Sequence, residues 1–299
     1  MRGFMSERPI LVTGGAGQLA SALAAASSSV RVVGRPDFDF DRPDSIEAAF
    51  RAANPVLVVN AAAYTAVDSA ETDSDAAFRA NRDGPTALAQ LCAAAGVPLI
   101  HISTDYVFDG TKGAPYTEAD AVSPTGVYGA SKLAGELAVL ASGARAAILR
   151  TSWVHYHVGK NFVRTMLTVG KTRERLTVVA DQRGCPTSAA DLADAVLAVA
   201  NRMLTGWRDH YAGVFHAAGT GDTTWFGLAQ AVFEDAAMQG WKIPVVAPIA
   251  TADWPTPARR PADSRLDCTR LADIFGARLP HWRDGLRRTT AAIFAAGGI

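Results

Sequence analysis

Short apolar segments alternate with alanine-rich segments through the first half of this chain, and no other feature constrains the fold as strongly. Runs of valine, isoleucine and leucine predict buried strands, whereas the alanine-rich segments have high helix propensity. Strands and helices that alternate in this way form a parallel sheet with helices on both faces. The predicted strands are 9–12, 30–33, 56–60, 98–103 and 146–151, and the predicted helices are 18–26, 44–53, 75–95 and 128–142. The predicted fold class is therefore α/β, a doubly wound parallel sheet, with a helix break near Gly84-Pro85.

A glycine-containing turn follows the first predicted strand, where Gly14 and Gly17 precede the helix that begins at Gln18 and Leu19. A strand, a tight turn and a helix N-terminus form a phosphate cradle, because glycine admits close backbone approach and the helix offers unpaired N–H groups. The spacing Gly14-x-x-Gly17-x-x-Ala20 is looser than G-x-G-x-x-G, so an ordinary strand-to-helix turn is the alternative. Its position at the start of the alternating pattern favours nucleotide binding.

The alternation weakens after residue 155, where proline and tryptophan become more frequent. We expect residues 1–155 to form a dinucleotide-binding domain, with segments near 188–218 returning to it. Residues 156–187 and 219–299 would form a smaller C-terminal α/β substrate domain. It would contain short strands near 178–179 and 245–246 and helices at 225–238 and 282–296, while the helix 189–203 and the segment 214–216 would return to the main sheet.

Tyr128 and Lys132 have the spacing Y-x-x-x-K, about one helical turn, so they would lie side by side on one helix face. A nearby ammonium favours the phenolate and lowers the pKa of a tyrosine, which is ~10 in water. Lys132 would therefore make Tyr128 a better proton donor near neutrality. An isolated pair of this kind more often marks a solvated helix face. Together with the glycine turn, the pair predicts a nicotinamide-dependent enzyme.

Charge and composition exclude several classes of protein. Lys plus Arg and Asp plus Glu both number 29, so no net field attracts nucleic acid or an anionic membrane. No apolar run is long enough to span a bilayer, and residues 1–8 lack the apolar core of a signal peptide. We therefore expect a cytoplasmic protein. Cys92, Cys185 and Cys268 are scattered without metal-type spacing and are expected to be reduced.

Five stretches of the chain resemble the motifs of the extended short-chain dehydrogenase/reductase family, especially those of its thymidine-diphosphate-sugar reductases. They are residues 59–68, 103–110, 127–136, 150–154 and 255–266. The resemblance implies a Rossmann fold and NADPH-dependent reduction of the C4 ketone of dTDP-4-dehydro-L-rhamnose, or of a related dTDP-4-keto-6-deoxysugar. It implies that Tyr128 is the general acid, that Lys132 holds the nicotinamide ribose and that Thr104 completes the triad. Hydride would attack the ketone while Tyr128 protonates the oxygen and Thr104 binds it.

Cofactor choice depends on the end of the second predicted strand, where NAD enzymes carry an acidic residue and NADP enzymes an arginine. Arg35 stands there without an acid, which favours NADPH and leaves NADH possible. A solvated Arg35 is the alternative. The resemblance implies that Asp39 and Phe40 contact the adenine, although Asp39 could be a polar loop residue. It also implies a cofactor-lining set of Ala62, Ala63 and Thr65, together with Tyr128 and Lys132.

The resemblance places Thr104, Asp105 and Trp153 near the sugar, with Asn161 opening the first helix of the substrate domain. Arg259 and Arg260 are candidates for the diphosphate, because paired guanidinium groups suit phosphate oxygens. A surface cluster of salt bridges is the alternative for these arginines.

The chain departs from the family at several positions. His155 replaces the usual tyrosine, and His157 follows it, yet no nearby cysteine or carboxylate completes a metal site. Some family members dimerise around magnesium held by glutamates, and the corresponding positions here are Ala22 and Ala190. We therefore predict no magnesium bridge and a monomer or weak homodimer.

Two other functions share parts of this pattern. Dehydratases and epimerases share the tyrosine and lysine, but dehydratases need an Asp-Glu pair after the threonine, whereas Tyr106 follows Asp105 here. Non-catalytic, dinucleotide-binding regulatory subunits have similar chains. The intact set of Thr104, Tyr128 and Lys132 favours an enzyme over such a subunit.

Overall fold

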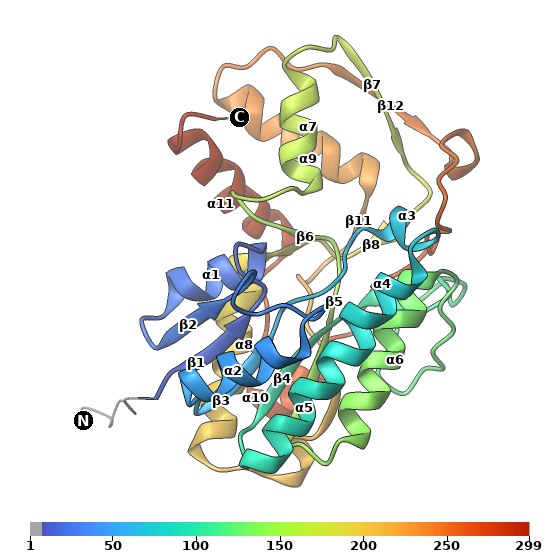
Figure 1. Cartoon of the computed structure of the whole chain (residues 1–299). Coiled ribbons are helices and arrows are strands. Elements are labelled where there is room, and N and C mark those ends of the chain that lie inside the picture. Colours follow the sequence, from blue (N-terminus) through green and yellow to red (C-terminus); the bar gives the residue numbers. More distant parts are fainter. Residues whose placement is uncertain (1–7, 299) are drawn as a thin grey trace.

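A six-stranded parallel sheet forms the centre of the molecule in the computed structural model, which describes residues 8–298. The sheet order is β10-β5-β4-β3-β1-β2 (Figure 1), so the predicted doubly wound α/β fold is confirmed. The strands are β1 Ile10–Thr13, β2 Val30–Val33, β3 Leu57–Asn60, β4 Leu99–Thr104, β5 Ala146–Thr151 and β10 Gly213–His216. The segment expected to lack a signal peptide, residues 1–8, lies outside the described residues except for Arg8.

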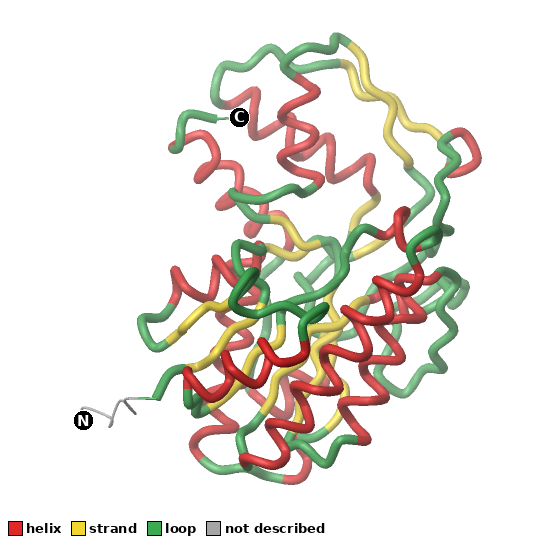
Figure 2. Tube along the Cα trace, viewed as in Figure 1, coloured by secondary structure: helices red, strands yellow, loops and turns green. Residues whose placement is uncertain are grey.

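Helices cover both faces of this sheet because successive strand residues point to opposite sides. Val12 and Val59 pack with one set of helices, while their neighbours Leu11 and Val58 pack with the other. The first set is α1 Gln18–Ala26, α8 Ala189–Thr205 and α10 Thr269–Phe275. The second set is α2 Pro43–Ala53, α5 Gly84–Ala95 and α6 Val127–Ala141. Figure 2 shows these helices flanking the strands.

The expected helix break at Gly84-Pro85 is wrong. The chain remains helical from α4 Ser74–Phe78 through the π-helical segment η1 Arg79–Asp83 into α5, so the irregularity precedes the proline. Pro85 is the second residue of α5, so the missing N–H of the proline falls where the continuous helix changes from π to α geometry. The π segment carries the buried Asn81, whose side chain donates to Ser131 on α6 at 3.0 Å. A side chain at Gly135 would meet the Asn81 carbonyl oxygen at 1.9 Å, so this segment fixes where α6 docks.

A smaller lobe lies beside the sheet and is drawn at the top of Figure 1. Its apolar core packs between α7 Phe162–Gly170, α9 Trp225–Met238 and α11 Trp282–Ala295. The predicted short strands are present as β7 Arg175–Val179 and β12 Val245–Ile249, which pair in parallel. Two further strand pairs lie between this lobe and the sheet, β6 Val154–His155 with β9 Thr187–Ser188 and β8 Arg183–Gly184 with β11 Thr223–Thr224.

The remaining elements are short. They are α3 Val67–Ala70 and the 3-10 turns η2 Asp105–Val107, η3 Asp209–Tyr211 and η4 Thr251–Asp253. Between residues 8 and 298, none of the helices has both the length and the apolar character that crossing a bilayer requires.

Candidate active site

The glycine turn after β1 brings three loops into backbone contact at the carboxyl end of the sheet. Gly14 has a φ of +111°, and a Cβ on it would lie 3.1 Å from the backbone of Ala61, which follows β3. A Cβ on Gly34, which follows β2, would lie 2.5 Å from the Cα of Gly15. No side chain caps the N-terminus of α1, so the first N–H groups of this helix are available to an anion.

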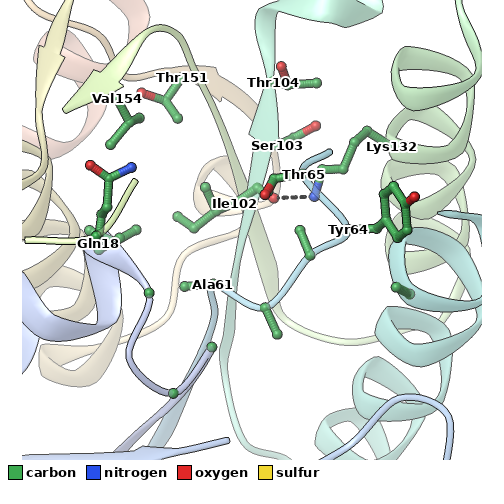
Figure 3. Close-up of a pocket in the computed structure, with 18 of the residues that line it drawn as sticks. Gln18, Ala61, Tyr64, Thr65, Ile102, Ser103, Thr104, Lys132, Thr151 and Val154 are labelled. Carbon is green, nitrogen blue, oxygen red and sulfur yellow. Dashed lines mark hydrogen bonds between the residues drawn. The ribbon is translucent and has the colours of Figure 1, made fainter. Parts of the chain in front are cut away.

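A cavity of about 960 Å³ opens above these loops, a volume within the range of small-molecule and cofactor sites. Its walls include residues at the carboxyl ends of several strands, such as Ala61, Thr104 and Thr151 (Figure 3). The loop that leads to α7 adds Gly159 and Lys160. The predicted residues that line it are Gly14, Gly17, Gln18, Leu19, Arg35, Asp39, Phe40, Ala62, Ala63, Thr65, Thr104, Asp105, Tyr128, Lys132 and Trp153. Residues far apart in the sequence therefore meet in one site.

A buried polar network supports the loop after β3. Thr13 Oγ1 donates to Asn60 Oδ1 at 2.6 Å and accepts from the Ala62 N–H at 3.1 Å. Asn60 Nδ2 lies 3.0 Å from His101 Nδ1. Burial, together with the nearby Lys132 ammonium, holds the pKa of His101 well below its usual value. The neutral imidazole can therefore accept the hydrogen bond that orients Asn60.

Thr104, at the end of β4, lies between an acid and a phenol. Its Oγ1 donates to Asp105 Oδ1 at 3.1 Å and accepts from the Tyr106 N–H at 3.2 Å. Asp105 is buried, which raises the pKa of its carboxyl group to about 6 despite hydrogen bonds from Ser264 and Thr104. The Thr104 hydroxyl also reaches the phenol of Tyr128.

Tyr128 and Lys132 lie on α6 beside the cavity, but their electrostatics differ from expectation. Burial raises the pKa of Tyr128 to about 12, and the hydrogen bond with Thr104 opposes this rise. The Lys132 ammonium instead donates to the carbonyl oxygen of Ile102 at 2.7 Å, which Figure 3 marks with a dashed line. The expectation that Lys132 lowers the pKa of Tyr128 is therefore wrong in this arrangement. Removal of the phenol from water determines the direction of the Tyr128 pKa shift.

Burial also lowers the pKa of Lys132, to about 8, because the ammonium is removed from water. Glu136 opposes this shift from one helical turn further along α6. Lys132 therefore loses its positive charge as the pH rises through about 8.

The residues present fit a dinucleotide. Ser103 Oγ and Thr151 Oγ1 line the cavity and are buried without a hydrogen-bond partner among the described residues, so both are available to a polar ligand. The tight approach at Gly14 and the uncapped N-terminus of α1 suit a pyrophosphate.

Arg35 lies at the rim of this cavity with 70% of its side chain exposed. Its guanidinium pairs with Asp39 at 3.1 Å and with Asp41 at 3.3 Å. The pKa of Asp39 is lowered chiefly by the backbone N–H of Asp41, with Arg35 also contributing. The two expected cofactor residues, Arg35 and Asp39, therefore form one ion pair at the end of β2.

Trp153 lines the cavity in an unusual backbone conformation. Its φ is +48°, in the left-handed region that costs an L-residue with a side chain roughly 1–2 kcal/mol. The indole lies against Gly184, where a Cβ would come within 2.4 Å of the ring. The Trp153 carbonyl accepts from the Thr187 N–H at 3.3 Å.

Three predicted substrate residues lie outside the cavity lining. Asn161 caps α7 by accepting from the Arg164 N–H, and its Nδ2 donates to Gln18 at 3.0 Å. Arg260 makes a two-pronged ion pair with Asp68, with distances of 3.0 and 2.8 Å. Arg259 is exposed on the same loop. The Arg260 side chain therefore pairs with the Asp68 carboxylate and does not line the cavity.

Of the positions that depart from the family, His155 and Ala22 are buried, whereas His157 and Ala190 are partly exposed. His155 is buried with Nδ1 3.1 Å from Thr289 Oγ1, and burial lowers its pKa to about 4. The ring of His157 packs against Tyr156. The described residues include no group of three or more metal-ligating side chains. Ala22 is buried in α1, and neither it nor Ala190 can supply a carboxylate.

Several lining residues were missed by sequence reasoning. Gly34, Ser103, Tyr106 and Ser152 adjoin residues that were predicted, so proximity along the chain was the available signal. Lys160 directly precedes the predicted Asn161, but only the fold brings Lys160 to the cavity and leaves Asn161 outside its lining.

Comparisons with known proteins place the chain among sugar-nucleotide enzymes. The profile of a family described as the RmlD substrate binding domain matches residues 8–294. A dTDP-4-dehydrorhamnose reductase of Sinorhizobium fredii is 46% identical over 291 residues, which cover 96% of this chain and 98% of that protein. A dTDP-4-dehydrorhamnose reductase of Escherichia coli is 41% identical and is covered to 87%, as is this chain.

Solved structures agree with these sequence matches. The structure of a dTDP-4-dehydrorhamnose reductase from Clostridium acetobutylicum aligns with a TM-score of 0.87 and 36% identity, covering 96% of this chain and 99% of that chain. The enzyme of the same name from Bacillus anthracis, in complex with NADP, aligns with a TM-score of 0.87 and 32% identity. This match covers 96% of this chain and 100% of that chain.

Proposed function

This chain belongs to the RmlD substrate binding domain family, and we propose that it is an NADPH-dependent reductase of the C4 ketone of dTDP-4-dehydro-L-rhamnose. The extended short-chain dehydrogenase/reductase resemblance and the reductase activity expected from it are confirmed by relatives of up to 46% identity. NADPH as cofactor is supported by the NADP complex of the Bacillus anthracis structure. The observation that carries the proposal is the meeting of Thr104, Tyr128 and Lys132 at one cavity with the glycine turn.

The roles of individual residues follow from their chemistry. NADPH supplies the hydride that reduces the ketone carbon. Tyr128, whose pKa is about 12, carries its proton throughout the neutral range and delivers it to the developing alkoxide. The Thr104 hydroxyl, which accepts from the Tyr106 N–H, would turn its single proton from Asp105 to the same oxygen. Lys132 provides a buried ammonium one helical turn along α6 from Tyr128, and we propose that it holds the nicotinamide ribose.

Asp105 and Trp153, which follow the carboxyl ends of the neighbouring strands β4 and β5, are proposed to contact the sugar. The division into a dinucleotide-binding domain, residues 1–155 with a return near 188–218, and a substrate domain also remains our proposal. Pairing of β10 with β5 supports the return of that segment to the main sheet. The cytoplasmic location and the monomer or weak homodimer stay predictions.

Turnover assays test the function directly. Purified protein should oxidise NADPH when dTDP-4-dehydro-L-rhamnose is added, and the product should be dTDP-L-rhamnose by chromatography against a standard. Turnover only with another dTDP-4-keto-6-deoxysugar would support the alternative substrate. Dinucleotide binding without turnover of any such sugar would support the non-catalytic regulatory subunit instead.

The pH dependence should show an alkaline decline set by Lys132. Because its pKa is about 8, the ammonium is present below pH 8 and is lost as the pH rises through that value. We expect kcat/KM for NADPH, which reports ionisations of the free enzyme, to fall above about pH 8. Lys132→Met should be less active at every pH and should lack this decline. A decline that persists unchanged in Lys132→Met would show that another group causes it.

Arg35 should set the preference between cofactors. Arg35→Ala should raise the KM for NADPH by roughly tenfold, because a charge-assisted contact with the 2′-phosphate is lost. The KM for NADH should stay within about twofold, since NADH lacks that phosphate. Arg79→Ala is a matched control, because Arg79 pairs with Asp41 at 3.2 Å but does not line the cavity. Equal changes for both cofactors in Arg35→Ala would contradict this assignment.

A further inference from the structure

The indole of Trp153 is stacked on a second tryptophan that does not line the cavity. The ring centroids of Trp153 and Trp225 lie 3.6 Å apart, and the ring planes are inclined by only 7°. Trp225 is the first residue of α9, and Phe162, the first residue of α7, packs against its ring with centroids 4.7 Å apart. The first turns of two helices of the smaller lobe are therefore connected to the cavity wall through aromatic contacts.

The backbone of Trp153 makes this support necessary. A residue at a φ of +48° has little intrinsic preference for its conformation, so the surroundings must maintain it. Trp225 covers one face of the indole. The edge of the ring lies in the space that a Cβ on residue 184 would fill, and Gly184 leaves that space open. Both contacts act on the ring itself, and together they fix the plane that the indole presents to the cavity.

We propose that Trp225 is a positioning residue that holds Trp153 as the wall on which the sugar of the nucleotide substrate packs. An aromatic face suits the apolar side of a 6-deoxysugar, which includes a methyl group. Affinity for the sugar then depends on α9, although α9 lies behind the cavity wall. This inference rests on the proposed function, because it assumes that a dTDP-sugar occupies the site.

The stack has a spectroscopic signature that is independent of activity. Two indoles in close contact couple their electronic transitions and give paired positive and negative bands in the far-ultraviolet circular dichroism spectrum. The parent protein should show this couplet, and Trp225→Leu, Trp225→Phe and Trp153→Phe should each lose it. Trp241→Leu is the matched control, because Trp241 lies in the same lobe against Phe294 and should leave the couplet intact.

Binding assays test the positioning role itself. Trp225→Leu should weaken binding of dTDP-L-rhamnose by roughly three- to tenfold, the magnitude of one aromatic contact. Its affinity for dTDP, which lacks the sugar, and for NADPH should remain within about twofold of the parent. Trp225→Phe, which restores a flat ring, should bind dTDP-L-rhamnose almost as the parent does. Gly184→Ala, which displaces the indole from its edge, should show the same selective loss as Trp225→Leu.

The outcomes separate this inference from the proposed function. If the parent binds dTDP-L-rhamnose and the variants bind it equally well, the positioning role is wrong while the function stands. Equal weakening toward dTDP and dTDP-L-rhamnose would also overturn the role, because the defect would not be specific to the sugar. If the parent binds no dTDP-L-rhamnose but retains the couplet, both the proposed function and this assignment fail.

Discussion

Replacing Tyr128 with phenylalanine should lower kcat with dTDP-4-dehydro-L-rhamnose by roughly 10²- to 10⁴-fold, the range for losing a general acid. The change removes only the phenolic oxygen that the Thr104 hydroxyl reaches. Asp105, with a pKa of about 6, is mostly ionised at neutral pH and cannot replace the lost acid. Steady-state turnover at saturating NADPH and sugar measures the effect.

Cofactor binding distinguishes lost chemistry from lost structure in this variant. NADPH should bind to Tyr128→Phe within about threefold of the parent affinity, because the glycine turn and Arg35 are unchanged. Tyr116→Phe is the matched control: Tyr116 donates its phenolic proton to Asp109 at 2.9 Å and lies outside the cavity lining. Its kcat should stay close to that of the parent. Turnover by Tyr128→Phe within tenfold of the parent would remove Tyr128 as the acid.

Replacing Glu136 with glutamine should destabilise the protein by about 3–5 kcal/mol, the usual effect of breaking a buried ion pair on one side. Glu136 accepts two hydrogen bonds from Arg150 of β5, at 2.9 and 2.7 Å, and both side chains are at most 5% exposed. Glutamine would leave the Arg150 guanidinium buried without a countercharge. Urea denaturation followed by circular dichroism measures the loss.

Two companion variants separate this effect from a general loss of charge. Glu174→Gln removes a carboxylate from an exposed pair with Lys242 and should change stability by less than about 1 kcal/mol. The double variant Glu136→Leu with Arg150→Met should recover much of the stability, because an apolar pair needs no countercharge. If Glu136→Gln unfolds at the parent urea concentration, the ion pair does not hold α6 against β5.

The Glu136 carboxylate affects both the stability of the protein and the pKa of Lys132. Glu136 lies one turn beyond Lys132 on α6 and raises the pKa of that ammonium against the effect of burial. Any Glu136 variant that still folds should therefore lose its activity at a lower pH than the parent. This shift in the alkaline decline would not follow from destabilisation alone.

Local patterns in the sequence were sufficient to predict the main architecture. The strand at 9–12, the glycines after it and the helix from Gln18 follow from short-range preferences, and the structure places them as β1, the turn and α1. Tyr128 and Lys132 share a face of α6 because residues four apart in a helix do so in any context. The misplaced break near Gly84 shows the limit of this reasoning. Proline is tolerated here because the helix changes from π to α geometry at this point. Gly84 packs against Phe40, which is distant in the sequence, so no local pattern could reveal this contact.

The sequence by itself determined the parallel α/β fold, the glycine turn after the first strand and the shared helix face of Tyr128 and Lys132, because each depends on periodicity or on neighbouring residues. The role of Thr104 came from the family resemblance and remains a proposal. Tertiary structure alone decided the partners of polar and aromatic side chains. It paired Arg260 with Asp68, 192 residues away, and Asn161 with Gln18, 143 residues away. It also stacked Trp225 on Trp153 and buried Tyr128, so that the pKa of the phenol rises. Such contacts and the removal of water arise only when distant segments pack together, and no local pattern encodes them.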